Sequence, residues 1–513
     1  MRLFAKVLVA SAPLAVACSV EFSPRECKVD SDCGTSLVCV PAGQAGNASL
    51  SQASCVSPDK APLRIGISAP ATGPNQDLGN QMSEGIQLAF KEQNDKGGVR
   101  GRQLELVFKD DGYVPASAQS NAGELLDVRA ATSLPPRCPS TKDTPPTEPP
   151  VSTTRLERGP GSVLAILGNV GTPTMVRFAP IAVETETLFF GAFTGATLML
   201  RDDLAGPCKR FIFNVRASYA QEARATLEYF LYPRCEGGGC HVTDYQHLIS
   251  FDQKDTYGQA GYTGLVNAYK ALSQQASRKL PQLPDDTAIP RFQYERNIIG
   301  AGRDAGRNAI THIQNNILKG NTATHYVGVL MTDTYSAGAD FIKEIQDWRA
   351  QLPAEDAKRL IVFFSNVSFV GPNSLATLLA SAGSRYTENV FVSQVVPNYA
   401  QDESAIVRDY QRMVPDASRR NYTSFEGYIT AHVFVEGLLA QNGSYTADNL
   451  INTFENLRDV SLGLGAGSGF SPARGGQPAD HNYTKSVWGT AIQPNGSFKN
   501  VYFWQEGIEI QVY

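Results

Sequence analysis

Two short stretches in the first half of the chain combine glycine with hydroxylated residues, and each follows a short apolar run. They are Gly171–Thr174 (GTPT) and Ala192–Ala196 (AFTGA). Loops of this kind at the ends of buried strands leave backbone N–H groups free, and these groups hold a carboxylate at a helix N-terminus without any charged side chain. The alternative is that their threonines merely cap helices. We therefore expect these loops to bind a small anionic group.

Motifs of the common enzyme classes are absent from the sequence. There is no nucleophile elbow, no H-E-x-x-H pair and no phosphate-binding loop. The glycine run Leu462–Gly469 lacks the G-x-G-x-x-G spacing and does not lie between a strand and a helix, which favours a surface loop. His241 and His247 flank a strand without an acid and a nucleophile in triad-like context, which favours isolated surface histidines. The sequence thus predicts a protein that is not an enzyme and needs no metal or cofactor.

The composition limits the class of protein. The chain has 513 residues, a formal charge of -5, and ordinary apolar and charged fractions of 42% and 19%. Such a chain can bury more than one core, and its length suggests two or three domains. No cluster of Lys and Arg of the kind that neutralises phosphates is present, so we expect no nucleic-acid partner.

The N-terminus has the layout of an export signal. A charged start, Met1–Lys6, precedes an apolar stretch, Val7–Ala17, that is too short to span a bilayer. Leu14–Ala17 before Cys18 looks like the lipobox of bacterial lipoproteins, although that pattern prefers a larger residue than Ala15. The alternative is an ordinary signal cleaved after an A-x-A site. We predict that Cys18 is lipidated and anchors the chain to a membrane.

Nine cysteines in an exported chain favour disulfide bonds over metal binding. If Cys18 is acylated, an even number remains. The segment 18–60 is too short and polar to bury a core unaided, and its four cysteines allow three pairings: Cys27, Cys33, Cys39 and Cys55. A four-thiolate zinc site is the less favoured alternative, because paired C-x-x-C knuckles are missing. Cys235 and Cys240 are expected to close their own loop, which leaves Cys138 and Cys208 to pair.

The stretch that begins at Leu63 reads as a complete strand, helix and strand unit. Leu63–Ser68 and Leu104–Phe108 are short apolar runs typical of parallel strands, and between them apolar residues recur at helical spacing from Gln81. Similar runs alternate with helical stretches later in the chain, at His247–Phe251, Tyr326–Leu330, Leu360–Phe364 and Asn389–Ser393. The alternation predicts an α/β fold with two doubly wound, mostly parallel sheets, which bind ligands at the carboxyl ends of their strands.

Several blocks resemble, in order, the type I periplasmic solute-binding proteins of ABC importers, in the branch that includes the leucine/isoleucine/valine-binding protein. The first unit contributes IGISAPATGP, LGNQMSEGIQLAF and NDKGGVRGRQLELVFKDD. The later blocks are GNVGTPTMVRFAPIAVETETLFFGAFTGA, FIFNVRASYAQEA, FDQKDTYGQAG, TYSAGADFIKE, NVSFVG, SQVVP and FEGYITAHVFVEGLL. The resemblance covers roughly the chain from Leu63 onward. It implies two lobes joined by a hinge of several crossovers.

This resemblance also suggests how the chain is divided. We expect a signal peptide over residues 1–17, a Cys-rich tether over 18–60, a first lobe over 61–216, a second lobe over 217–395, a return to the first lobe over 396–490, and C-terminal strands over 491–513. Stacked prolines fit neither a sheet nor a helix, so the insertion at 130–161 within the first lobe is expected to be extended and exposed.

The same resemblance implies which residues contact the solute. Two loops match those that grip the carboxylate and part of the amine in amino-acid-binding relatives, two tyrosines match rings that cover the ligand, and one leucine matches a residue that lines the side-chain pocket. These residues are Thr172, Phe193, Thr194, Gly195, Tyr257, Tyr335 and Leu78. Each tyrosine, taken alone, could equally be a core residue.

One position departs from the family pattern. Relatives that bind leucine pair its ammonium with an acid where this chain has Ser368. A solute bound at micromolar affinity has only about 8 kcal/mol of binding free energy, and a buried ammonium without a carboxylate would lose roughly 2 to 5 kcal/mol of it. Either Asp333, Asp255 or Glu222 substitutes, or the solute is not an ordinary α-amino acid. A small carboxylate, an amide or an aromatic acid stays open.

The resemblance predicts an extracytoplasmic solute-binding lipoprotein that captures an amino acid or similar small carboxylate and delivers it to ABC permease subunits. The expected location is the periplasm or cell envelope of a bacterium, with the membrane reached only through a lipid anchor. A sensor of the same fold that signals to a protein partner is an alternative, and a hydrolase is the less favoured one.

Overall fold

The computed structural model describes most of the chain. The described residues are 25–28, 30–34, 37–40, 42, 47, 52–131, 134–138, 152–197, 201, 206–231, 242, 244–278, 280–457, 460 and 462–513. The predicted signal peptide, Cys18, Cys235, Cys240 and His241 lie outside them. Among the helices in the described part, none is both long and apolar enough to cross a bilayer.

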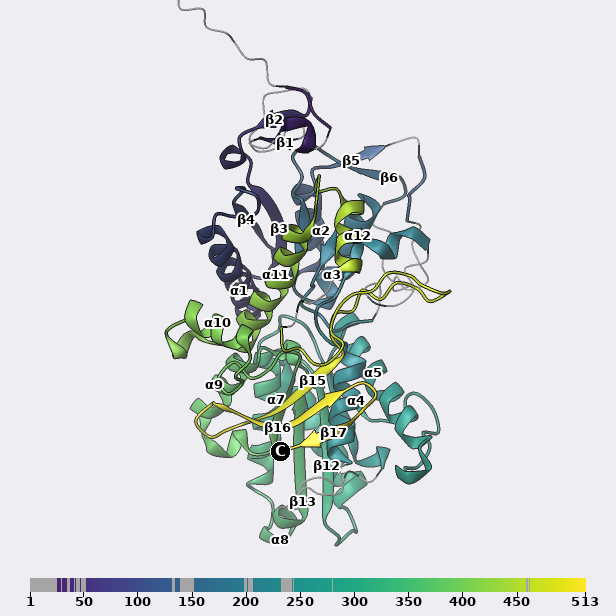
Figure 1. Ribbon diagram of the computed structural model, residues 1–513. Helices are drawn as coiled ribbons and strands as arrows, with labels where there is room; N and C mark the ends of the chain where they lie inside the picture. The colour runs from purple at the N-terminus through teal and green to yellow at the C-terminus, as the bar shows by residue number, and fades with distance from the viewer. Residues whose placement is uncertain are drawn as a thin grey trace, which may run out of the picture.

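The first lobe is built on a parallel five-stranded sheet (Figure 1). The strand order is β4 (Leu104–Asp110), β3 (Leu63–Ala69), β7 (Ala165–Leu167), β8 (Phe189–Phe190) and β9 (Ile212–Phe213). Its helices include α1 (Gln76–Asp95), α2 (Pro115–Leu125) and α3 (Thr172–Glu184). The central strands β3 and β7 bury nearly all their side chains, as apolar strands covered on both faces do.

The chain comes back to this lobe after the second one, through α10 (Ala405–Met413), α11 (Tyr422–Ala440) and α12 (Ala447–Asn456). Helix α11 lies along α1, and glycines allow the two backbones to approach closely. A Cβ atom on Gly85 would fall 1.9 Å from the carbonyl oxygen of Ser424, and one on Gly427 would fall 2.4 Å from that of Met82. The first lobe is therefore assembled from two distant segments.

The second lobe has an eight-stranded mixed sheet. The strands follow the order β11 (Arg291–Tyr294), β10 (Leu248–Gln253), β12 (His325–Thr332), β13 (Leu360–Asn366), β14 (Val390–Gln394), β15 (Ser486–Ile492), β16 (Phe498–Gln505) and β17 (Ile508–Val512). The first five are parallel, and the last three are antiparallel additions. Its helices are α4 (Tyr219–Phe230), α5 (Thr256–Ser273), α6 (Ala301–His312), α7 (Tyr335–Arg349), α8 (Ala354–Arg359) and α9 (Pro372–Ala382).

The structure adds details that the sequence pattern did not give. The predicted boundary at residue 490 falls inside β15, because Ser486–Ile492 pairs with β14 as one continuous strand. The Pro-rich insertion is bracketed by an antiparallel pair, β5 (Val128–Ala131) and β6 (Arg155–Arg158). Its ends are therefore paired strands, whereas we had expected extended chain from residue 130 to residue 161.

Six cysteines of the described residues lie at disulfide distance. In the N-terminal segment, which contains β1 (Val38–Val40) and β2 (Ser54–Val56), Cys27 lies against Cys39 and Cys33 against Cys55. Cys138, at the start of the insertion, lies against Cys208. Of the three pairings that the sequence left open for the N-terminal segment, the structure thus selects one.

Candidate functional site

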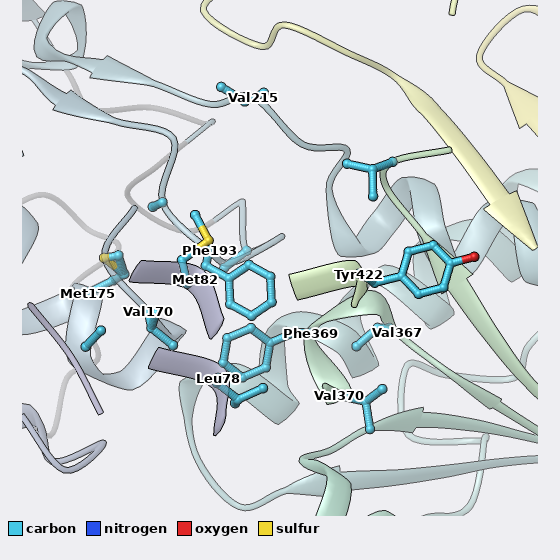
Figure 2. Close-up of a cluster of buried hydrophobic side chains, with 14 of the residues drawn as sticks. Leu78, Met82, Val170, Met175, Phe193, Val215, Val367, Phe369, Val370 and Tyr422 are labelled. Carbon is cyan, nitrogen blue, oxygen red and sulfur yellow. The ribbon is translucent and has the colours of Figure 1, made fainter. Parts of the chain in front are cut away.

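Both lobes contribute side chains to one buried cluster between the sheets, drawn in Figure 2. Phe369 belongs to the short turn η7 (Ser368–Val370) that follows β13 in the second lobe. Its ring is fully buried and lies 5.0 Å from the ring of Phe193 in the first lobe, 4.8 Å from Tyr257 and 6.1 Å from Tyr113. The carboxyl ends of the two sheets therefore meet in an aromatic box, where open α/β sheets bind ligands.

The threonines predicted from the two glycine-containing loops meet directly. The Oγ1 atoms of Thr172 and Thr194 are 2.7 Å apart, and Thr194 Oγ1 lies 3.2 Å from the Tyr219 hydroxyl. Gly195 packs so closely on Tyr219 that a Cβ atom there would fall 2.7 Å from the Tyr219 backbone nitrogen. The two loops therefore lie together, and their hydroxyl groups form one polar row beside the aromatic box.

The sequence predicts free backbone N–H groups in the second loop, Ala192–Ala196, but three of these groups are hydrogen-bonded within the protein. The N–H groups of Phe193, Thr194 and Ala196 donate to Asn169 O, Ala192 O and Thr194 Oγ1. These three N–H groups are therefore engaged within the protein. Residues 192–197 also lie outside any helix, so Thr194 does not cap one. The Thr194 hydroxyl, rather than these amides, is therefore the group that this loop can present to a solute.

Thr172, the threonine of the first loop, is not a helix cap either. Thr172 is the first residue of α3, and the cap position before it is Gly171, which adopts a left-handed φ of 94° and has no side chain. Tyr113 closes in on that glycine, since a Cβ atom on Gly171 would fall 2.2 Å from the Tyr113 ring. Because residue 171 is a glycine, the Tyr113 ring can pack directly against the N-terminus of α3.

The remaining predicted residues lie around the same cluster. Tyr257 is fully buried, and its hydroxyl donates to Asp333 O at 2.8 Å. Burial raises its pKa well above the ordinary value, so the ring stays neutral. Leu78 of the first lobe and Tyr335 of the second both lie against Gly371, within 2.9 Å and 3.0 Å of a Cβ atom built there. These two residues therefore meet at the junction of the lobes.

Ser368 belongs to a buried charged network. Its backbone N–H donates to Glu222 Oε2 at 2.7 Å and its hydroxyl donates to Glu222 Oε1 at 3.1 Å. Ser393 Oγ donates to the same carboxylate at 2.7 Å. Arg216 donates through Nη2 to Glu222 and to Ser368 Oγ. Glu222 therefore lies against residue 368, where the family resemblance led us to expect an acid, and this carboxylate already has an arginine partner.

Sequence reasoning missed Arg216, Tyr219, Phe369 and Tyr113. The side chain of Arg216 is 1% exposed, with its guanidinium carbon 5.0 Å from the centre of the Phe193 ring. Burial alone would lower the pKa of Arg216, but Glu426 and Glu222 outweigh burial and raise it. An arginine between two apolar residues in the block Phe211–Ala217 was the available signal, because a charged residue in such a setting is buried only when it is paired.

Contacts at the edge of the cluster join the lobes. Asn297 of the second lobe accepts a hydrogen bond from Asn75 Nδ2 at 2.8 Å and donates to Gly112 O at 3.2 Å in the first lobe. Ser374 Oγ donates to Asp77 Oδ2 at 2.7 Å. The structure therefore has the lobes closed on each other.

Comparisons with known proteins agree with this architecture. A family model described as periplasmic binding protein matches residues 62–135. Leu/Ile/Val-binding protein homolog 2 of Brucella abortus (strain 2308) is 36% identical over 66 residues, which are 13% of this chain and 18% of that protein. This match therefore spans less than a fifth of the curated relative.

Solved structures extend the likeness to both lobes. A possible leucine/isoleucine/valine-binding protein from Rhodopirellula baltica SH 1 has a TM-score of 0.63 at 26% identity, over 86% of this chain and 96% of that one. A branched chain amino acid ABC transporter protein from Thermus thermophilus with bound valine has a TM-score of 0.59 at 14% identity, over 88% and 98%. The predicted fold class is confirmed: the chain has the fold of type I periplasmic binding proteins, and its first unit is similar in sequence to leucine/isoleucine/valine-binding proteins.

Proposed function

We propose that this chain is an extracytoplasmic, non-enzymatic solute-binding protein that closes its lobes on an amino acid or similar small carboxylate and delivers it to an ABC importer. One observation carries the proposal: polar and aromatic side chains from both lobes converge on one buried cluster. Thr172, Thr194 and Phe193 come from the first lobe, and Tyr257 and Phe369 from the second. A cluster assembled by both lobes forms only on closure, so a solute that contacts both stabilises the closed form.

The remaining parts of the proposal concern the cell envelope. The N-terminal segment is a tether held by the Cys27–Cys39 and Cys33–Cys55 bridges, and Cys138–Cys208 holds the insertion. Such bridges suit an oxidising compartment. Lipidation at Cys18 would attach the tether to a membrane, and permease subunits would be the partners of the closed form.

Thermal unfolding against a panel of amino acids, small carboxylates, amides and aromatic acids tests the proposal. A solute that binds only the folded chain adds about 2.7 kcal/mol at a hundred times its dissociation constant, which raises the midpoint clearly. Preparation through denaturant and refolding removes any retained solute. If no member of the panel shifts the midpoint, the proposal is contradicted.

A variant locates the binding event. Thr194→Val removes the hydroxyl that Thr172 and Tyr219 contact while nearly keeping the volume, so affinity for the active solute should fall about tenfold. Thr187→Val is the matched control, because Thr187 is equally buried and its hydroxyl group bonds only to Thr185 among the described residues. Equal affinity in the two variants would argue against the site.

A further inference from the structure

Of the three acids that the sequence offered as partners for a ligand ammonium, two are ion-paired within the protein. Glu222 accepts from Arg216 Nη2 and from two serines. Asp255 pairs with Arg296 at 2.7 Å and also accepts from Tyr257 N at 2.9 Å. Both carboxylates therefore already have a cation beside them.

The third acid, Asp333, is fully buried, and both of its carboxyl oxygens lack a hydrogen-bond partner among the described residues. The Asp333 carboxyl lies under the first turns of α7, since a Cβ atom on Gly338 would fall 1.9 Å from its Oδ2 and 3.5 Å from Asn366 Oδ1. Burial raises the pKa of Asp333 well above its ordinary value, which favours the neutral acid. A neutral carboxyl group gives an ammonium no counter-charge.

The charged groups around Arg216 leave no place for a ligand cation. Arg216 Nη1 lies 3.4 Å from Glu426 Oε1, and Nη2 lies 3.3 Å from Glu222 Oε1. Glu426 also interacts electrostatically with Arg201, whose Nη1 donates to Asn482 Oδ1. Burial raises the pKa of Glu426 to about 7, so near neutral pH this acid is only partly ionised. The two guanidinium groups are then not fully offset, so an added ammonium would meet positive neighbours, whereas an added carboxylate would meet spare positive charge.

The guanidinium of Arg216 nevertheless keeps hydrogen-bonding capacity. Among the described residues, its buried Nε and Nη1 atoms have no hydrogen-bond partner. The group stacks on Phe193 and lies 5.9 Å from the centre of the Tyr219 ring, whose hydroxyl continues to Thr194 and Thr172. Buried donors without acceptors are costly, and an acceptor supplied by a solute would satisfy them.

The aromatic box indicates what kind of group the solute carries besides that hydrogen-bond acceptor. Phe369 presents a benzyl group to Phe193, Tyr257 and Tyr113 from a three-residue turn, and the next residue, Gly371, has a left-handed φ of 80°. The fully buried Phe369 ring fills the space between these rings, so a solute group of about this size packs there when Phe369 moves out of the box.

Building on the proposed function, we propose that the solute is a carboxylate with an apolar or aromatic body and no ammonium group. Its carboxylate accepts from Arg216 and from the Thr172–Thr194 hydroxyl pair, and its apolar body packs in the box that Phe193 and Tyr257 form. The residue that distinguishes this site from an amino-acid site is Arg216, held beside Ser368 by Glu222.

Matched solutes that differ only in the amino group test the inference on the full chain. We expect 3-phenylpropanoate to bind about a hundredfold more tightly than L-phenylalanine, and 4-methylpentanoate more tightly than L-leucine, in titration calorimetry. Equal or tighter binding of the amino acid in either pair overturns the inference but leaves the proposed function standing. Silence from all four overturns the inference, and silence across the whole panel contradicts the proposed function as well.

An arginine variant gives a second readout. Arg216→Lys keeps the positive charge beside Glu222 and removes the Nε and Nη1 donors, so affinity for 3-phenylpropanoate should fall about tenfold. Arg291→Lys is the matched control, because Arg291 also pairs with a buried carboxylate, Asp252, and stacks on a tyrosine ring. Unchanged affinity in Arg216→Lys, with the unfolding midpoint retained, overturns the inference. If that variant fails to fold, the matched solutes still decide the question on the unaltered chain.

Discussion

A single carboxylate, Glu92 of α1, connects three helices of the first lobe. Its side chain is 6% exposed, and it accepts from Tyr428 on α11 at 2.5 Å and from Arg412 on α10 at 2.8 Å. His432 and Lys96 lie within 3.2 Å. The His432 contact lowers the pKa of Glu92 most, those of Tyr428, Arg412 and Lys96 lower it further, and burial opposes them.

This gives a pH-dependent prediction for Glu92→Gln. A carboxylate whose pKa is depressed by folding stabilises the folded state above its unfolded value of 4.5, and this contribution is lost as the pH falls through the lower folded pKa. At pH 7 we expect the variant to lose about 1 to 3 kcal/mol of unfolding free energy, measured by urea denaturation. The difference from wild type should shrink as the pH falls below 4.5.

A control on the same helix separates this effect from general charge removal. Glu84 pairs with Arg419 near the surface, with side chains 34% and 67% exposed. Glu84→Gln should change stability by less than about 1 kcal/mol at either pH. If Glu92→Gln behaved like this control, the carboxylate would have no special role in joining the helices.

Single residues also show what the sequence could predict. Thr172 and Thr194 were proposed as site residues from their setting after apolar runs and from the resemblance, and their hydroxyl oxygens lie 2.7 Å apart in the structure. Phe369 was missed because an apolar ring in a loop has no local pattern that reports its burial. Arg216 was missed although its apolar neighbours were a signal, because an acidic partner of its guanidinium is distant in the sequence. Their positions depend on contacts between segments about 150 residues apart, such as Arg216 with Ser368.

Among the elements, the turn between β11 and α6 fastens one lobe to the other. Asn297 in this turn has a left-handed φ of 59°, and its side chain bonds to Asn75 and Gly112 of the first lobe. Asparagine tolerates this backbone conformation better than most residues do, and its amide supplies the contacts.

We therefore expect Asn297→Gly to weaken the closed form without straining the turn. Glycine accepts the same φ, so the unfolding midpoint should stay near that of wild type, whereas solute dissociation should become about tenfold faster. Stopped-flow displacement measures that rate. Asn389→Gly is the control, because Asn389 has a φ of 55° and precedes β14 in the second lobe. Equal dissociation rates in the two variants would show that Asn297 does not fasten the lobes.

Some helices and strands were predicted from the sequence and others were not, for physical reasons. Long apolar strands such as β12 and β13 and the helix α11 were recognised from their periodicity. The edge strand β11 was not, because a four-residue, half-exposed strand that follows a Pro-rich loop carries little hydrophobic signal. The joining of β15 to the second sheet also escaped, since strand partners are chosen by tertiary packing.

At the scale of the whole molecule, the N-terminal segment lies at the end of the first lobe that is far from the second lobe (Figure 1). It contacts the lobe at Ala61, which shares a buried cluster with Val38 and Val40 of the segment. The aromatic box lies on the opposite side, between the sheets. Tether and binding cluster are therefore separate parts of the molecule.

Removal of residues 1–60 should therefore leave the dissociation constant of the active solute unchanged within about twofold, because none of the described residues of that segment belongs to the cluster. Calorimetric titration of both forms under oxidising conditions makes the comparison. A marked loss of affinity in the shortened chain would mean that the N-terminal segment takes part in binding.

The interleaving of the two lobes along the chain has a consequence for biosynthesis. The first lobe takes α11 and α12 from residues 422–456, and the second sheet takes its last strands from residues 486–512. A nascent chain is made from its N-terminus onward. Helix α11 therefore cannot cover α1, and neither lobe can be completed, until synthesis is nearly finished. Such distant pairings also form slowly. The lobes thus complete their folding only late in synthesis, which suits a protein proposed to act outside the cytoplasm.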